Sequence, residues 1–232
     1  VDTGGGDARD ELAVEPGIAR RQRGVAALEE IRLRRGLLVD AERQQLGEYV
    51  PRGRPHGDVA RRLYRATFTL DGNHTFPVFE TDHLGFSTQR GRFNKTSGRI
   101  TLDVAARKGS VEVSIDAASI DMGFAKWNEN MRGEGFFNTE AFPTITFKAD
   151  RLQFDGDKPV SAEGSLTLLG VTRPVALTLT RFHCAPHPLN KRETCGADIL
   201  ATLKRSDFGM TKYIPSVGDE VRLSIAVEAY RE

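Results

Sequence analysis

The strongest constraint on the fold is a two-residue alternation of apolar and polar side chains that recurs after residue 63. It is clearest near the C-terminus, where Val221, Leu223, Ile225 and Val227 are separated by residues that are polar or small. Successive side chains of a strand point to opposite faces of a sheet. Each such strand therefore has one buried and one solvated face, which is typical of antiparallel sheets.

The alternation predicts a closed all-β fold. About eight or nine short strands separated by turn residues indicate a sandwich or a barrel. An eight-stranded barrel is just wide enough to hold one small ligand. We therefore predict an antiparallel sandwich or barrel with one or two short helices, and periodicity leaves open whether its interior is filled by side chains. The expected strands are residues 64–69, 75–80, 98–104, 111–116, 144–154, 160–168, 175–180, 197–204 and 221–228.

One stretch between two of these strands has a helical period instead. Phe124, Trp127 and Met131 recur at helical spacing, and Phe136 and Phe137 follow at once. A short helix that packs its apolar stripe on the sheet explains this pattern better than a cofactor-binding motif does. So many large apolar side chains near one end of the sheet indicate either a cap over the core or the lip of an apolar cavity.

The first 63 residues differ in composition from the rest. All 13 Phe and the single Trp lie at or beyond residue 68, and Tyr49 is the one aromatic residue before residue 64. A segment with so few large side chains cannot bury enough surface to offset chain entropy. We predict a poorly structured Arg-rich arm, residues 1–63, before a barrel domain, residues 64–232. The arm's acidic residues argue against a transit peptide, and no signal peptide is visible in it.

Charge and motifs favour a binding protein over an enzyme. Lys and Arg number 33 against 32 Asp and Glu, a net charge of +1, so no strong field recruits nucleic acid. The sequence has no G-x-S-x-G, P-loop, H-E-x-x-H or dinucleotide-binding pattern. No nucleophile with an orienting partner can be assigned beside Asp82 and His83. We therefore expect no catalysis, no metal and no cofactor, and we interpret His74 and His83 as hydrogen-bonding residues at a strand end or a barrel mouth.

Two cysteines flank a Pro-containing segment. Cys184 and Cys195 are accompanied by His183 and His187, a set that offers zinc ligands but without zinc-finger spacing. A disulfide that pins a hairpin loop is the preferred interpretation, with a zinc site or two free thiols as the alternatives. A structural disulfide would place the mature protein in an oxidising compartment such as a periplasm.

Ordered motifs are spread over about 170 residues, from Tyr64 to Glu232. They are Leu70 to Thr75, Phe79 to His83, Gly91 to Phe93, Gly98 to Asp103, Phe136 to Asn138, Phe142 to Phe147, Gly164 with Leu166 to Leu168, Gly170 to Val175, and Arg205 to Met210. In these stretches the chain resembles the YceI-like family of polyisoprenoid-binding periplasmic proteins. Many members have a His-Leu pair shortly before the double Phe, where this chain has Asn130-Met131.

The resemblance implies a lipocalin-like antiparallel β-barrel of about eight strands with one or two short helices and a long apolar cavity. It also implies a non-enzymatic carrier, periplasmic or secreted, that holds a polyprenyl chain, a quinone tail or a similar amphiphile in the barrel. The alternative is a quinone-linked redox or stress-response accessory that works with a membrane cytochrome. A membrane cytochrome and a second copy of the chain are the protein partners considered. His83 and Asp71 are candidates for polar groups at the cavity mouth. The predicted ligand-binding residues are Phe79, His83, Phe93, Phe136, Phe137, Phe147, Leu177, Leu223 and Ile225.

Overall fold

The computed structural model describes residues 65–232. The arm predicted for residues 1–63, and the start of the first strand at Tyr64, lie outside these described residues.

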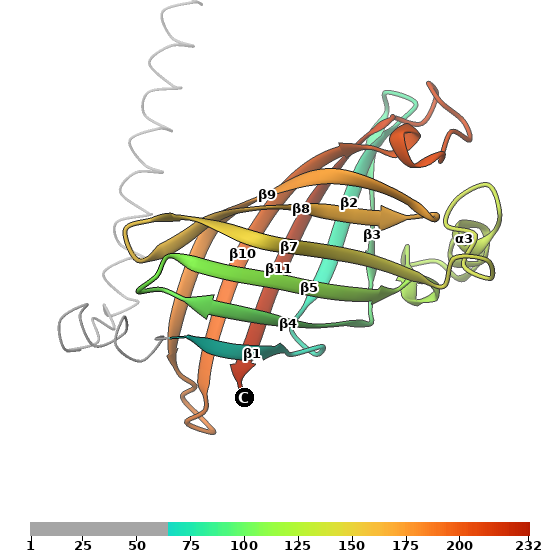
Figure 1. The fold of residues 1–232 in the computed structure, drawn as a ribbon. Coiled ribbons are helices and arrows are strands. Elements are labelled where there is room, and N and C mark those ends of the chain that lie inside the picture. The colour runs from blue at the N-terminus through green and yellow to red at the C-terminus, as the bar shows by residue number, and fades with distance from the viewer. Residues whose placement is uncertain (1–64) are drawn as a thin grey trace, which may run out of the picture. The chain divides into compact units, whose positions relative to one another are not determined.

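The described chain forms one closed antiparallel barrel of eight strands (Figure 1). The barrel closes because β1 pairs with β4 on one side and with β11 on the other. This confirms the predicted all-β barrel. The barrel strands, in the order in which they neighbour one another, are β1 (Ala66–Leu70), β4 (Thr96–Asp103), β5 (Lys108–Asp116), β7 (Thr144–Asp155), β8 (Lys158–Leu168), β9 (Val171–Pro186), β10 (Glu193–Lys204) and β11 (Glu220–Arg231).

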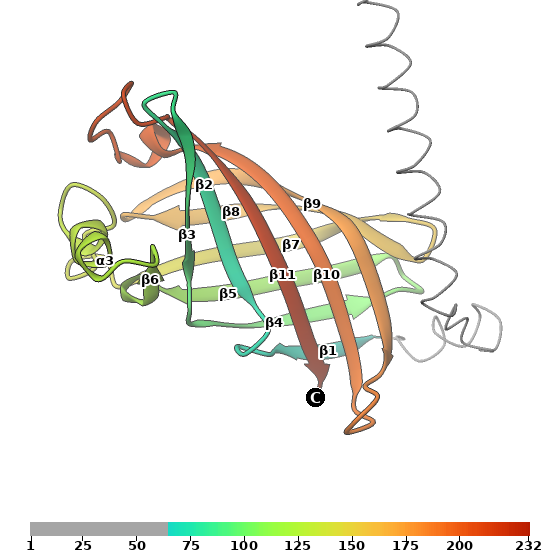
Figure 2. The same cartoon turned by 180° about the vertical axis from the view of Figure 1, so that it is seen from behind.

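Three further strands extend the sheet past the point of closure. β2 (Phe76–His83) pairs with the first half of β11, β3 (Ser87–Phe93) pairs with β2, and the short β6 (Ile120–Asp121) pairs with β3. The second half of β11 pairs with β1, so β1 and β2 use successive parts of the same strand edge. The β2–β3 hairpin therefore runs alongside β11 toward the end of the barrel at which β11 begins (Figure 2).

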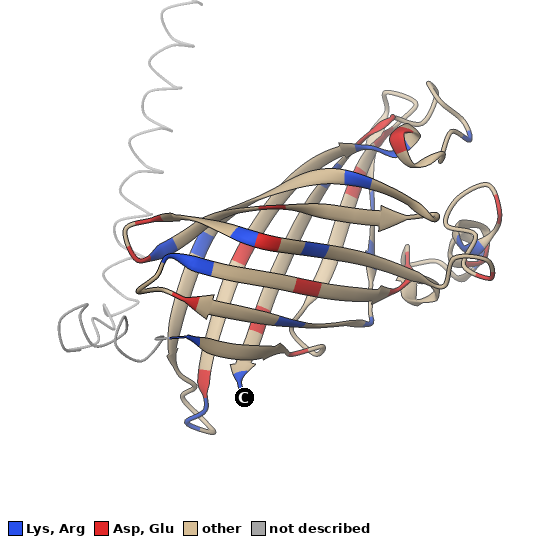
Figure 3. Cartoon of the chain, viewed as in Figure 1, with Lys and Arg blue, Asp and Glu red and all other residues tan. Residues whose placement is uncertain are grey.

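Strand register confirms the alternation read from the sequence. Leu223 is paired with Ala201 on β10 and with Phe79 on β2, and its side chain faces the interior. Ser224 is paired with Leu200 and Val78 and is exposed on the outer face. Lys, Arg, Asp and Glu are interspersed along the strands (Figure 3), and Arg222 of β11 is exposed like Ser224.

Two apolar clusters occupy the interior. The first joins β2, β3, β5 and β7 to the segments around α3 (Ala125–Arg132) and η2 (Arg205–Phe208), and includes Phe79, Phe93, Phe136, Phe137 and Phe147. The second, which we call the far-end cluster, lies among β1, β4, β9, β10 and β11. Its buried members are Ala66, Phe68, Leu70, Leu102, Val104, Cys184, Cys195 and Ala229.

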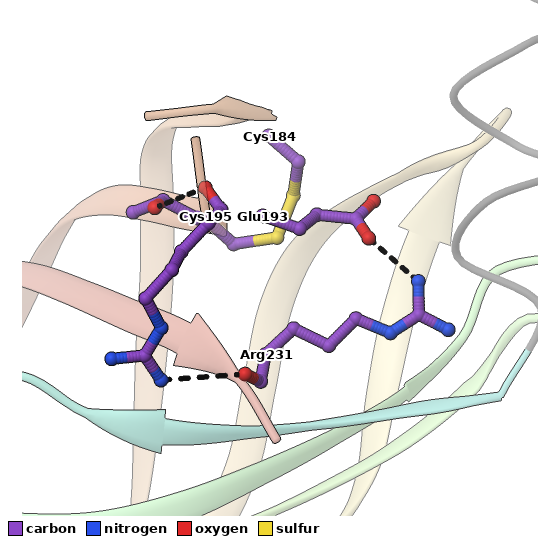
Figure 4. Close-up of a disulfide and its surroundings, with 6 residues drawn as sticks. Cys184, Glu193, Cys195 and Arg231 are labelled. Atoms are coloured by element: carbon purple, nitrogen blue, oxygen red, sulfur yellow. Dashed lines mark hydrogen bonds and ion pairs between the residues drawn. A yellow bond between two sulfur atoms is a disulfide. The ribbon is translucent and has the colours of Figure 1, made fainter. Parts of the chain in front are cut away.

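A disulfide joins the β9–β10 hairpin within the far-end cluster. Cys184 and Cys195 are cross-strand partners in the β9–β10 ladder, and their sulfur atoms are bonded (Figure 4). Both cysteines are buried, and the described residues contain no free cysteine. Beside the disulfide, Arg231 Nη1 lies 2.6 Å from Glu193 Oε2 and ties β11 to the start of β10. The preferred interpretation of the two cysteines was correct, and the zinc and free-thiol alternatives are excluded in this structure.

The predicted helix is present but is not packed flat on the sheet. α3 (Ala125–Arg132) contains no buried residue, although Trp127 and Met131 face the barrel interior. η1 (Ala117–Ser119) and β6 lead into it. The helix forms part of the rim at one end of the barrel (Figure 1), which matches the expected lip of a cavity. None of the helices between residues 65 and 232 is long and apolar enough to cross a membrane.

Candidate functional site: an apolar cavity inside the barrel

A cavity of about 440 Å³ runs through the barrel interior and touches both apolar clusters. This volume lies within the range of small-molecule sites, about 300–1,000 Å³. The structure brings all of the predicted ligand-binding residues to its wall: Phe79, His83, Phe93, Phe136, Phe137, Phe147, Leu177, Leu223 and Ile225.

Strands β9 to β11 form a wall of the cavity, and their own side chains do not fill the space beside it. Leu177, Leu223 and Ile225 face inward, yet each is only partly buried. In a barrel filled by its own side chains such residues would be fully buried, because protein interiors are close-packed. Their accessible surface therefore belongs to the cavity, and it is apolar.

A cluster of three phenylalanines forms another part of the wall. The ring centroids of Phe79 and Phe93 are 5.8 Å apart, and Phe137 lies 6.0 Å from Phe79 and 5.2 Å from Phe93. These tilted and edge-on arrangements are the favourable ones for aromatic pairs. The cluster is thus a stable apolar surface that connects the β2–β3 hairpin to the segment after α3.

The cavity has its mouth at the α3 end of the barrel. Among its described lining residues, Trp127 and Tyr213 are the two that are exposed to solvent. Trp127 is on α3, and Tyr213 is on the segment 209–219 that joins η2 to β11. His83, at the end of β2, lines the cavity close by and forms a backbone bridge with Val217. Sequence reasoning did not single out Tyr213 or Val217.

Arg205 binds the backbone of the segment that forms part of the mouth. Its side chain is buried and lines the cavity, and its guanidinium donates to the carbonyl oxygens of Gly218, Met210 and Val217 at 2.8, 3.0 and 2.9 Å. Burial lowers the pKa of Arg205 from its ordinary value, and the negative charge of Asp219 opposes that shift. An arginine nevertheless stays protonated in proteins. The guanidinium therefore fixes the 209–219 segment and leaves a positive charge at this end of the cavity.

Asn130 and Met131, which stand where the resemblance leads one to expect His-Leu, lie in two environments. Met131 lines the cavity, whereas Asn130 is exposed and its backbone carbonyl accepts from Gly133 N at 3.1 Å.

A second polar cluster lies outside the cavity, beside the second half of β11. His74 Nδ1 is 2.6 Å from Asp71 Oδ2 and 3.8 Å from Glu228 Oε2. The hydrogen bond with Asp71 and the charge of Glu228 raise the pKa of His74. Burial acts to raise the pKa of Asp71, but hydrogen bonds from His74, Asn73 and Tyr230 bring it below its ordinary value.

This cluster corrects one prediction. Asp71 does not line the cavity, so its expected place at the mouth was wrong. The turn that carries it lies between β1 and β2, where these strands meet along the middle of the β11 edge rather than at the barrel end. Asp71, His74 and Glu228 offer oxygen and nitrogen atoms within 4.8 Å of one another, close enough to hold a metal ion. The short His74–Asp71 hydrogen bond accounts for the geometry without one.

Comparison with known proteins assigns the family. The model of the YceI-like domain matches residues 68–229, which is most of the barrel. The chain belongs to the YceI-like domain family. A UPF0312 protein of Pseudomonas aeruginosa (strain LESB58) is 33% identical over 177 residues, covering 75% of this chain and 92% of that protein.

Solved structures share the fold of this YceI-like chain. The crystal structure of Burkholderia cenocepacia BcnA has a TM-score of 0.58 at 24% identity and covers 68% of this chain and 98% of that one. A polyisoprenoid-binding domain from Saccharophagus degradans, implicated in plant cell wall breakdown, has a TM-score of 0.55 at 18% identity. It covers 72% of this chain and 99% of that one.

Proposed function

We propose that this YceI-like chain binds an isoprenoid-type lipid in its barrel and acts as a non-enzymatic carrier or buffer for it. The observation that carries the proposal is the cavity of about 440 Å³, with its apolar wall and a mouth at the α3 end. The ligand contacts are the nine predicted lining residues. The polyisoprenoid-binding domain of the same fold in Saccharophagus degradans supports this choice of ligand class.

The energetics of such a cavity favour a hydrocarbon chain. Burial of one CH₂ group contributes about 0.8 kcal/mol, so a five-carbon isoprene unit contributes about 4 kcal/mol when fully buried. One hydrogen bond contributes only about 1 kcal/mol net. Affinity is therefore expected to depend on how much of the chain enters the cavity, and polar groups at the mouth, such as His83, would orient the headgroup.

The disulfide supports a periplasmic or otherwise extracytoplasmic location. Structural disulfides persist in oxidising compartments and are rare in the cytosol. Cys184 and Cys195 are buried and bonded across two strands, so the bond is part of the barrel's framework. A carrier in that compartment would exchange lipids with a membrane bordering the same space.

A matched pair of variants tests whether the lipid lies inside the barrel. Leu223 faces the cavity, and Leu223→Arg would place a charged chain where the lipid is expected. Ser224, one residue along β11, is exposed on the outer face, so Ser224→Arg adds the same charge outside. Each purified variant is titrated with ubiquinone and with a polyprenyl alcohol, and retained lipid is quantified by mass spectrometry.

The proposal predicts that Ser224→Arg retains as much lipid as the unmodified protein and that Leu223→Arg loses most of it. Circular dichroism must show that both variants are folded, since burying an unpaired charge is costly. Should folded Leu223→Arg retain as much lipid as Ser224→Arg, the ligand does not lie beside this strand and the proposal is wrong.

A further inference from the structure

Large apolar side chains are exposed around the mouth of the cavity. Phe86, at the tip of the β2–β3 hairpin, is 89% exposed, and Trp127 on α3 is 42% exposed. They belong to a set that we call the apolar rim: Leu84, Phe86, Phe124, Trp127 and Tyr213.

The apolar rim is carried by the β2–β3 hairpin, the 209–219 segment and α3 with the residue before it. The 209–219 segment is hydrogen-bonded to the β2–β3 hairpin, because Leu84 N donates to Ser216 O at 2.8 Å. It also meets the segment after α3, where the rings of Tyr213 and Phe136 are 6.2 Å apart. The β2–β3 hairpin, the 209–219 segment and α3 lie at the same end of the barrel (Figure 1).

Much of the apolar surface of the rim is exposed and so contributes nothing to the packing of the barrel. An exposed Phe at a hairpin tip gains none of the stabilisation that burial would give it. Contiguous exposed apolar groups mark protein or membrane contact surfaces, and aromatic residues with a polar edge, such as Trp and Tyr, favour the membrane–water interface. Trp127 and Tyr213 also line the cavity, so the rim continues directly into the proposed lipid path.

Charges near the rim are of both signs. Lys212 Nζ lies 5.0 Å from the Tyr213 ring centroid, and Lys126 is paired with Glu129 at 2.8 Å. Asp82 and Glu134 are exposed on the hairpin and after α3. A surface with charges of both signs is compatible with headgroups that carry both signs themselves.

We propose that the apolar rim docks on a zwitterionic bilayer surface and holds the cavity mouth against it. The rim side chains enter the interface, so a lipid passes between bilayer and cavity without crossing water. This inference rests on the proposed function, since it assigns the source from which the cavity is filled.

Two exposed residues at opposite ends of the barrel give a matched test. Leu189, in the β9–β10 connection, is 86% exposed, close to the value for Phe86. The full chain and the variants Phe86→Ser and Leu189→Ser are mixed with phosphatidylethanolamine–phosphatidylcholine vesicles and assayed by flotation. We expect Phe86→Ser to lower the partition coefficient about tenfold or more, because one buried Phe is lost from the interface, and Leu189→Ser to leave it unchanged.

The single tryptophan provides a second readout. Trp127 is the only Trp in the chain and lies on the rim, so docking should shift its fluorescence to shorter wavelength and protect it from acrylamide. The proposal is overturned if the full chain does not partition, or if Phe86→Ser and Leu189→Ser weaken partitioning equally. It is also overturned if sedimentation shows that Phe86→Ser disrupts a dimer while vesicles bind nothing, because the rim then joins two copies of the chain.

The lipid content of the same samples separates this inference from the proposed function. Phe86→Ser should still hold lipid when it is loaded from detergent, because the cavity wall is unchanged. Loss of vesicle binding with lipid retained therefore supports docking by the rim. Vesicle binding by a protein whose cavity takes no lipid would contradict the proposed function and leave the rim as a membrane contact.

Discussion

Removal of the Cys184–Cys195 disulfide should lower the stability of the barrel by an amount that depends on the length of the loop that the bond closes. The two cysteines are separated by 11 residues in sequence. A loop of this length restricts the unfolded chain by about 3 kcal/mol in the chain-entropy model. For a domain of this size each kcal/mol shifts the melting temperature by about 2–4 °C, so the expected decrease is about 6–12 °C.

The assay is differential scanning calorimetry of the unmodified protein and of the double variant Cys184→Ala/Cys195→Ala, with and without reductant. Both cysteines are buried in the far-end cluster, so the double variant also loses sulfur packing. The reduced unmodified protein keeps both sulfur atoms, and it isolates the contribution of the covalent bond. Reductant should destabilise the unmodified protein and leave the double variant unchanged. A shift of less than about 2 °C on reduction would refute the loop-entropy reasoning.

Three other changes test local features of the barrel. A Cβ at Gly98 would collide with the backbone carbonyl of Glu112, whereas one at Gly196 would meet nothing closer than 3.5 Å. Gly98→Ala should therefore cost about 1–3 kcal/mol in urea unfolding and Gly196→Ala much less, and equal losses would contradict the packing. The interactions that raise the pKa of His74 stabilise the fold fully when the pH lies below the unfolded-state pKa of about 6.5. This stabilisation is lost as the pH rises through the folded-state pKa. The difference in melting temperature between the unmodified protein and His74→Gln should be larger at pH 5.5 than at pH 9, and a constant difference would exclude the interaction. Arg205→Met leaves three carbonyl acceptors without their donor, so the free energy of unfolding should fall by about 3 kcal/mol. A decrease of less than about 1 kcal/mol would show that other contacts hold the 209–219 segment.

Alternation in the sequence was sufficient to predict the barrel wall, because a period of two determines which face each side chain occupies. It separated Leu223 from Ser224, and both the barrel and the inward position of Leu177 are confirmed. The helical spacing of Trp127 and Met131 likewise located α3.

Other features carry too weak a local signal. β3 has the sequence Ser-Thr-Gln-Arg-Gly-Arg-Phe, in which Phe93 is the only large apolar side chain, so no alternation is visible. The mouth residue Tyr213 lies in an irregular segment whose position depends on tertiary hydrogen bonds. Arg205 was within reach of sequence reasoning, because it continues the inward register of Leu203 on β10. An inward charge at the end of an apolar strand indicates a buried structural or binding role.

The misplacement of Asp71 has a topological cause. From the sequence, Asp71 was a candidate for a polar group at the cavity mouth. β1 and β2 instead pair with successive halves of β11, so the intervening turn lies along the wall. This arrangement becomes visible only once the strand order is known.

The most direct test of the account is to identify the lipid that co-purifies with the full chain from cells. Gently purified protein is extracted with organic solvent, and the extract is analysed by liquid chromatography and mass spectrometry, with Leu223→Arg as the reference for adventitious lipid. We expect about one isoprenoid-type molecule per chain in the unmodified protein and much less in the variant. An extract that contains only membrane phospholipid, in equal amounts from both proteins, would contradict the claim that the barrel cavity holds an isoprenoid chain.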